Sequence, residues 1–331
     1  MSKITAAITA VGAYVPEDVL TNKMLEKMVE TNDEWIFSRT GIKERRILKD
    51  PEKGTSFMAI KAAEDLIKKS KIKPEEIDLV LLASITPDLP VAATAVYVAT
   101  QIGAINAFAY DIQAACSGFL YGMSTAAAYI ESGRYKKVLV IGADKMSSII
   151  DYTDRTTCII FGDGAGAALF EPNFEGLGLQ DEILRSDGIG REFLKIEAGG
   201  SLMPPTEITV SRRLHYVKQD GKTIYKFAVS KMADVSEEIM KKNNLDNNDV
   251  DWLIAHQANK RIVGATASRI NLEDEKVLMN IERYGNTTSA TLPLLLSDYE
   301  KLLKKGDTII FATFGGGFTW GSIYFKWAYN S

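Results

Sequence analysis

The chain has 331 residues, of which 46% are hydrophobic and 25% are charged, so it can bury a large core and a chain disordered throughout is excluded. Its 43 acidic residues exceed its 39 Lys and Arg residues, which argues against general nucleic-acid binding. Two cysteines and two histidines, with no CxxC pair, argue against a disulfide framework and a metal site and fit a reducing, cytoplasmic compartment.

Strands and helices are predicted to alternate along the first half. Residues 1–14 lack the apolar core of a signal peptide, and a first strand is expected over 4–12, followed by a polar segment over 21–46. Apolar residues at helical spacing predict a helix over 57–67, and further patterns predict a strand over 77–85, a helix over 92–101, a strand over 107–113, a helix over 117–131 and a strand over 137–142. This alternation is typical of parallel sheets with crossover helices, and the apolar runs are too short to cross a membrane.

The second half repeats the first at a constant offset. Residues 68–81 and 241–254 both read as a helix end, a polar loop and a strand, and the strand entries after Gly133 and Gly306 correspond in the same way (241 − 68 and 306 − 133 are both 173). We therefore expect two duplicated α/β halves, residues 1–172 and residues 173–331.

The duplication predicts where three polar side chains meet. Cys116 lies between a strand and a helix, and at an offset of about 170 it falls opposite Asn286, which lies between a strand-like run over 277–281 and a helix over 290–303. His256 follows the predicted strand of the second half. If the halves pack about a pseudo-twofold axis, these groups converge at the carboxyl ends of strands, where open α/β sheets usually bind ligands.

These residue types suit the chemistry of thioesters. A cysteine at the start of a helix faces unpaired N–H groups, which favours the nucleophilic thiolate, although Cys116 considered alone also fits a small core residue. A thiolate both attacks and leaves readily, which suits acyl transfer. Imidazole and carboxamide donate hydrogen bonds without a net charge, so His256 and Asn286 favour formation of an enolate on a thioester; hydrolysis is the alternative.

Six motifs occur in order along the chain: 35–42 around Trp35 and Arg39, 114–119 around Cys116, the glycine-rich run 161–167, 256–259, 285–287 and 314–321. Together they resemble the motifs of β-ketoacyl-[acyl-carrier-protein] synthase III, the initiating condensing enzyme of fatty-acid synthesis in the thiolase-like superfamily. The resemblance implies an α/β, five-layer αβαβα fold of two duplicated halves. It also implies a homodimer that condenses an acyl-CoA primer with malonyl-acyl-carrier-protein, with loss of carbon dioxide, and that needs no cofactor because acyl-CoA is a substrate.

The resemblance assigns roles to matching positions. Cys116 corresponds to the acylated nucleophile, and His256 and Asn286 correspond to the residues that stabilise the enolate. The N–H of Cys116 and that of a glycine in the loop Gly315, Gly316 and Gly317 correspond to the oxyanion hole. The positions that match coenzyme A contacts are Trp35, Arg39, Arg155 and Asn259.

Two further expectations concern partners and the acyl chain. Lys226, Arg261 and Arg269 are expected to form a basic patch that docks the acidic acyl carrier protein. At Leu89 some relatives carry a phenylalanine that reaches across the dimer to close the partner's acyl pocket. The smaller leucine predicts that primers longer than acetyl, or branched ones, are used.

Residues 199–219, Cys158 and three alternative functions remain to be considered. Residues 199–219 read as a flap over the entrance, with His215 exposed, and Cys158 reads as a core strand residue. The order Cys116, His256, Asn286 also fits a papain-type protease, but the sequence context of that family is missing. A condensing enzyme of specialised metabolism, making polyketides or alkylquinolones, shares the same three residues, and an inactive CoA-binding or scaffold protein is the non-enzymatic alternative.

Overall fold

The computed structural model describes residues 4–331, so the first three residues of the predicted N-terminal segment lie outside it. Two sheets carry the fold. The first has the order β1-β7-β6-β4-β5, with bounds β1 Thr5–Tyr14, β7 Gly164–Asn173, β6 Val138–Asp144, β4 Leu79–Ala83 and β5 Phe108–Ile112. The second has the order β11-β12-β13-β8, with bounds β11 Trp252–Ala255, β12 Thr308–Gly315, β13 Thr319–Lys326 and β8 Gly178–Ser186.

The second sheet repeats the plan of the first. In the first sheet β1 and β7 are antiparallel, β7 and β6 are antiparallel, and β6, β4 and β5 are parallel. In the second sheet β8, β13, β12 and β11 follow in the same order with the same directions. The counterpart of β5 is reduced to one parallel bridge between Leu253 and Val277. The predicted duplication is therefore visible in the topology.

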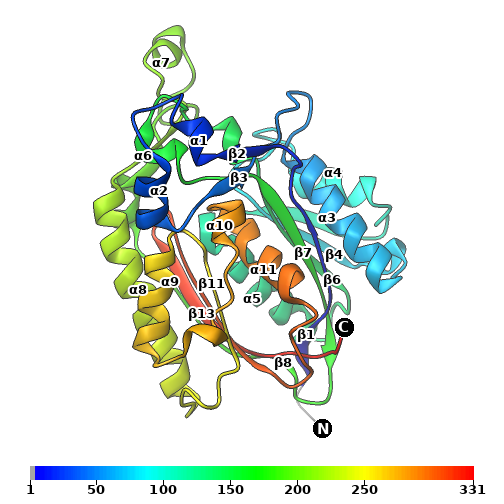
Figure 1. Cartoon of the computed structure of the whole chain (residues 1–331). Coiled ribbons are helices and arrows are strands. Elements are labelled where there is room, and N and C mark those ends of the chain that lie inside the picture. The colour runs from blue at the N-terminus through cyan, green and yellow to red at the C-terminus, as the bar shows by residue number, and fades with distance from the viewer. Residues whose placement is uncertain (1–3) are drawn as a thin grey trace.

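Helices fill three layers around the two sheets (Figure 1). Helices α3 (Thr55–Ser70) and α4 (Thr94–Gln101) cover the outer face of the first sheet, and α8 (Gly221–Lys242) and α9 (Lys260–Arg269) cover that of the second. Helices α5 (Gly118–Glu131) and α11 (Thr291–Tyr299) lie between the sheets. This confirms the five-layer thiolase-like α/β architecture.

Burial explains the sequences of these helices. Helix α5 is apolar on most sides because both sheets pack against it, and its buried residues include Phe119, Leu120, Met123 and Ile130. Helix α8 instead buries one face, with Met232, Val235 and Ile239, and exposes lysines on the other.

Shorter elements connect this framework. They are β2 (Val19–Thr21), α1 (Asn22–Leu25), α2 (Asp33–Thr40), β3 (Glu44–Arg46), η1 (Pro74–Glu76), η2 (Ala115–Ser117), η3 (Met146–Ser148), α6 (Arg155–Cys158), η4 (Gly188–Glu192), β9 (Leu194–Ile196), α7 (Glu207–Ser211), β10 (Val217–Gln219), η5 (Asp274–Lys276), α10 (Ile281–Tyr284) and η6 (Thr288–Ala290). Residues of η2, η3, β9, β10 and η6 line the two cavities beside Cys116.

Three local predictions need correction. Cys158 is buried as expected, but it is the last residue of the short helix α6 and does not lie in a strand. A helix starts here because the Asp154 side chain caps it by accepting a hydrogen bond from the Thr156 N–H. The expected strand over 277–281 makes only the bridge at Val277, since α10 begins at Ile281. The helix expected over 290–303 is α11, which ends at Tyr299. None of the helices found in residues 4–331 has the length and apolarity to span a bilayer.

Candidate active site

Cys116 is placed by a tight turn between β5 and α5. Ala115 has a left-handed backbone (φ 46°), and Cys116 follows it within η2, directly before α5 begins at Gly118. Among the described residues, no side chain caps the start of α5. The Ser117 hydroxyl donates to the Thr319 carbonyl at 3.1 Å, which fastens this turn to β13 of the other sheet. The cysteine is consequently held at the junction of the two halves, and only 8% of it is exposed.

Asn286 is fixed by both its backbone and its carboxamide. It forms a parallel bridge with Phe161, in which the Asn286 N–H donates to the Ile160 carbonyl (2.9 Å) and the Asn286 carbonyl accepts from the Gly162 N–H (3.0 Å). Its side-chain oxygen accepts a hydrogen bond from the Thr288 N–H at 2.9 Å. Because the oxygen is engaged, the NH₂ group remains as the donor that Asn286 can offer to a ligand.

His256 follows β11, where its N–H donates to the Ala312 carbonyl of β12 at 2.8 Å. The side chain is 1% exposed, and neither ring nitrogen has a hydrogen-bond partner within residues 4–331. Burial lowers the pKa of His256 to about 3, because the imidazolium would lose its hydration. The imidazole is therefore neutral near pH 7, with one N–H to donate and one nitrogen to accept.

The three side chains border the same cavity, of about 140 Å³, together with Phe161 and Phe314. The predicted meeting of Cys116, His256 and Asn286 is thus present in the structure. The strict offset pairs other residues, however: 289 − 116 and 286 − 113 are both 173, so Ser289 corresponds to Cys116 and Gln113 to Asn286.

A second and larger cavity, of about 440 Å³, lies on another side of Cys116. It shares Cys116, Phe161, Leu194 and Gly316 with the smaller one. Its other walls are largely apolar and include Ile85, Met146, Ile149, Ile196 and Val217. An acyl chain attached to the sulfur would find apolar surface here.

The thiol of Cys116 differs from the expectation of a ready thiolate. Burial, with a smaller contribution from the negative charge of Asp144, raises the pKa of Cys116 to about 12. Loss of hydration here outweighs the favourable position at the start of α5. Cys116 therefore rests as a thiol and needs a proton acceptor when it reacts, and the neutral His256 borders the same cavity.

The glycine loop approaches the nucleophile closely. A Cβ atom added at Gly315 would lie 2.8 Å from the amide nitrogen of Cys116 and 3.1 Å from that of Ser117. Gly315 and Gly316 line the smaller cavity, and Gly316 and Gly317 line the larger one. Only glycine leaves space at Gly315 for a substrate oxygen beside the Cys116 N–H.

The four residues predicted to contact coenzyme A form one cluster. The guanidinium carbons of Arg39 and Arg155 each lie 5.1 Å from the centroid of the Trp35 ring. The Asn259 side chain caps α9 by accepting from the Arg261 N–H, and it donates to the Arg39 carbonyl at 2.9 Å. Asn259 also lines the smaller cavity, so the cluster is continuous with the site.

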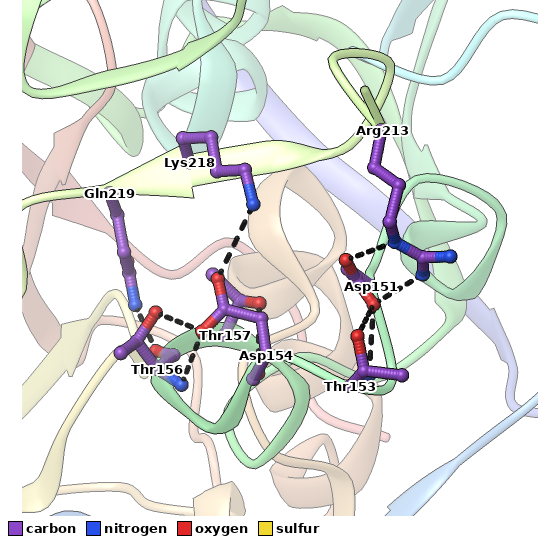
Figure 2. A network of polar contacts seen from close by, with 8 residues as sticks. All are labelled: Asp151, Thr153, Asp154, Thr156, Thr157, Arg213, Lys218 and Gln219. Carbon is purple, nitrogen blue, oxygen red and sulfur yellow. Dashed lines mark hydrogen bonds and ion pairs between the residues drawn. The ribbon is translucent and has the colours of Figure 1, made fainter. Parts of the chain in front are cut away.

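The segment 199–219, predicted to form a flap, is tied to residues 151–157, which include Arg155 at the start of α6 (Figure 2). Arg213 holds Asp151 with two hydrogen bonds of 2.8 and 2.6 Å, which lower the pKa of Asp151 well below its ordinary value. Lys218 pairs with Asp154 at 3.8 Å, and Gln219 donates to the Thr156 carbonyl. The sequence did not predict these contacts, because the paired residues lie about 60 positions apart and neither segment has a pattern that indicates the other as its partner.

The flap itself contains a small helix and few buried residues. Helix α7 stands away from the body of the molecule at the top of the view (Figure 1). His215 is half-buried rather than exposed as predicted, because its ring bonds to the Thr209 hydroxyl at 3.0 Å. It lines neither cavity beside Cys116.

The remaining predicted residues lie on the surface. Leu89 is 59% exposed and lines neither cavity of the single chain. Lys226 is exposed on α8, and the Arg261 guanidinium lies 5.3 Å from the Tyr225 ring. Arg269 instead pairs with Asp234 at 2.5 Å and Glu237 at 4.0 Å, so carboxylates of α8 offset its charge. Within residues 4–331, no three His, Cys, Asp or Glu side chains are grouped to hold a metal ion.

Similarity to known proteins extends over the whole chain. Residues 110–188 match the family described as 3-oxoacyl-[acyl-carrier-protein (ACP)] synthase III, and residues 240–327 match its C-terminal part. A β-ketoacyl-[acyl-carrier-protein] synthase III of Bacteroides thetaiotaomicron is 55% identical over 330 residues, covering 100% of this chain and 98% of that protein. The crystal structure of 3-oxoacyl-[acyl-carrier-protein] synthase III from Aquifex aeolicus matches with a TM-score of 0.90 at 39% identity, covering 97% of this chain and 100% of that chain. The priming β-ketosynthase of the R1128 polyketide pathway matches with a TM-score of 0.91 at 28% identity, covering 100% and 98%.

Proposed function

Because the chain belongs to the 3-oxoacyl-[acyl-carrier-protein] synthase III family of condensing acyltransferases, we propose that it condenses an acyl-CoA primer with malonyl-acyl-carrier-protein to give 3-oxoacyl-acyl-carrier-protein and carbon dioxide. The primer is carried on Cys116 between the two half-reactions. The reaction starts fatty-acid synthesis in the cytoplasm and uses no cofactor, since acyl-CoA is itself consumed.

The first half-reaction moves the acyl group to Cys116. The sulfur forms a bond to the acyl carbon, the bond from that carbon to the CoA sulfur breaks, and the proton of the cysteine leaves with CoA as its thiol. His256 accepts this proton in passing because its imidazole is neutral and neither ring nitrogen has a hydrogen-bond partner within residues 4–331. The N–H of Cys116 and one N–H of the glycine loop hold the oxyanion, and Trp35, Arg39, Arg155 and Asn259 hold CoA.

The second half-reaction forms the new carbon–carbon bond. The malonyl carboxylate leaves as carbon dioxide, and its electron pair becomes an enolate on the thioester oxygen, held by hydrogen bonds from His256 and Asn286. The enolate carbon attacks the acyl carbon on Cys116, and the bond from that carbon to the cysteine sulfur breaks. The sulfur then takes a proton from water, because its own proton left with CoA in the first half-reaction. Two neutral donors suit this step, whereas a carboxylate in either place would repel the enolate.

One observation carries the proposal: the cavity that holds Cys116 also holds a neutral imidazole and an oriented carboxamide. In the division we propose, Cys116 belongs to residues 1–172 and the two donors belong to residues 173–331. Strand β7 ends at Asn173 and β8 begins at Gly178, so the proposed boundary lies at the end of β7, one residue before the connection between the sheets.

We also propose a homodimer that places Leu89 in the partner's acyl pocket. Support comes from the apolar side chains exposed around α4, which are Leu89, Val91, Val96, Tyr97 and Ile105. Because leucine is smaller than phenylalanine, primers longer than acetyl or branched ones are accepted. The specialised-metabolism alternative is not favoured, since the priming β-ketosynthase of the polyketide pathway is 28% identical to this chain, whereas the β-ketoacyl-[acyl-carrier-protein] synthase III of Bacteroides thetaiotaomicron is 55% identical.

A panel of acyl-CoAs tests this function. Each primer is incubated with the enzyme and malonyl-acyl-carrier-protein, and the product is identified by mass spectrometry. We expect 3-oxoacyl-carrier-protein from acetyl, longer and branched primers, with the enzyme acylated at Cys116 when the malonyl substrate is omitted. Binding of CoA without acylation would indicate the inactive binding protein, and release of free acid would indicate a hydrolase. Activity with acetyl-CoA alone would contradict the role of Leu89.

A further inference from the structure

A completely buried carboxylate, Asp144, lies beside the site at the end of β6. It forms no ion pair within residues 4–331; hydrogen bonds satisfy it instead. One oxygen, Oδ1, accepts from the Ser84 hydroxyl (3.0 Å), the Ile85 N–H (2.8 Å) and the Thr86 hydroxyl (3.2 Å). The other, Oδ2, accepts from the Thr288 hydroxyl, the Ser289 N–H (3.2 Å) and the Ser289 hydroxyl (2.7 Å).

The two oxygens therefore hold different parts of the chain. Oδ1 is occupied by the segment after β4 of the first half, and Oδ2 is occupied by η6 of the second half. Burying a carboxylate without a cation is costly unless its oxygens accept several hydrogen bonds, so the structure keeps six donors around Asp144. Asp144 thereby fastens the turn that follows Asn286 to the first sheet.

Thr288 transmits this attachment to the site. Its backbone is left-handed (φ 51°), which is unfavourable for a β-branched residue and persists only where the surroundings impose it. Its hydroxyl is bonded to Asp144, and its N–H donates to the Asn286 side-chain oxygen at 2.9 Å. The bond to Asp144 holds Thr288 in the conformation that aims this N–H at the carboxamide.

We propose that Asp144 is a positioning residue for the condensation, because through Thr288 it orients the Asn286 carboxamide so that its NH₂ group faces the enolate. Asp144 touches no substrate. The inference rests on the proposed role of Asn286 and extends it to a residue that the sequence motifs do not single out. It predicts that loss of Asp144 impairs the decarboxylation of the malonyl thioester and spares the acylation of Cys116.

The two half-reactions are measured separately on the full-length enzyme. Acylation is followed as the mass gain of the protein with acetyl-CoA, and decarboxylation as the release of labelled carbon dioxide from malonyl-acyl-carrier-protein. Asn286→Ala is expected to slow decarboxylation about 100-fold, as for loss of one oxyanion donor. Asp144→Asn is expected to slow it at least about ten-fold, because part of the same stabilisation is lost. It is not expected to slow acylation, because the charge of Asp144 is only the smaller cause of the raised pKa of Cys116, and its loss would lower that pKa and favour the thiolate.

Matched variants separate positioning from general damage. Ser84→Ala removes a donor to the other oxygen of Asp144 and should leave both rates near native. Should Asp144→Asn fail to fold, Thr288→Val removes the hydroxyl that contacts Asp144, and Thr288→Ser should restore decarboxylation. Asp144→Asn should add little in an Asn286→Ala background, because both changes remove the same interaction.

The outcomes distinguish two kinds of failure. If Asn286→Ala decarboxylates normally, the proposed function of the site is wrong. If Asn286→Ala is impaired but Asp144→Asn and Thr288→Val are not, or if they slow both half-reactions equally, Asp144 is not a positioning residue.

Discussion

Ala115 and Thr288 occupy the same place in the two halves: they lie 173 residues apart (288 − 115), and both have left-handed backbones, with φ of 46° and 51°. Each opens a short turn, η2 or η6, that leads into a central helix, α5 or α11. The duplication has therefore kept an unfavourable turn twice. In one half the turn presents Cys116, whereas in the other the corresponding Ser289 bonds to Ala83 and Asp144 inside the protein.

The closeness of Gly315 and Cys116 predicts a strong effect of one methyl group. In Gly315→Ala the new Cβ would lie 2.8 Å from the Cys116 nitrogen, so the loop must shift and the oxyanion site is distorted. We expect acylation by acetyl-CoA to slow about 100-fold, as for loss of an oxyanion donor. The acylation rate is measured by mass spectrometry of the acyl-enzyme in samples quenched at successive times. Gly188→Ala is the control, because a Cβ there meets no atom within 4 Å; equal rates for both variants would refute the assignment.

The raised pKa of Cys116, about 12, predicts how the free enzyme reacts with iodoacetamide. Only the thiolate reacts, so the alkylation rate should rise about ten-fold per pH unit from pH 6 to pH 9 without a plateau, whereas an ordinary cysteine levels off near its pKa of about 8.5. The measurement uses the Cys158→Ser variant, because Cys158 is also a free cysteine with a raised pKa, about 11, and its alkylation would show a similar dependence on pH. A plateau below pH 8 would mean that the start of α5 dominates over burial.

The Asp151–Arg213 ion pair predicts that the flap depends on one tether. Arg213→Gln should expose residues 199–216 to thermolysin several-fold faster, because the bidentate bond to Asp151 is lost while the apolar cleavage sites remain. The neighbouring Arg212→Gln is the control and should change nothing. Since the pKa of Asp151 is lowered in the folded state, the tether is fully present above the unfolded pKa of about 3.9 and is lost only at lower pH. Native resistance should accordingly be equal at pH 5 and pH 8.

Within residues 4–331, the proposed docking patch contains two cations that form no ion pair, Lys226 and Arg261, and one that is paired, Arg269. Arg261→Glu and Lys226→Glu should raise the Michaelis constant for malonyl-acyl-carrier-protein several-fold at low salt without changing that for acyl-CoA, as expected for charges at an interface rim. Arg269→Glu should affect this constant less and lower the melting temperature more, because Asp234 and Glu237 already offset Arg269. Equal effects on both substrates would exclude a docking role for the patch.

The sequence predicted the parts of the structure that depend on local pattern and on repetition. The constant offset gave the two halves, and the motifs around Cys116, His256 and Asn286 marked residues that meet in one cavity. It did not predict the protonation of Cys116, because the position at the start of a helix is visible in the sequence whereas the depth of burial is not. Pairings between distant surface charges, such as Arg269 with Asp234, depend on how α8 and α9 pack and were missed for that reason.

One cavity is proposed to hold two sets of groups that act in different half-reactions: a sulfur that carries the acyl chain and two neutral donors that stabilise an enolate. The most direct measurement compares Cys116→Ala with His256→Ala in the release of labelled carbon dioxide from malonyl-acyl-carrier-protein. We expect Cys116→Ala still to decarboxylate this substrate although it is never acylated, and His256→Ala to lose about 100-fold or more in decarboxylation. If Cys116→Ala released no carbon dioxide while His256→Ala released it at the native rate, the assignment of the two half-reactions would be contradicted.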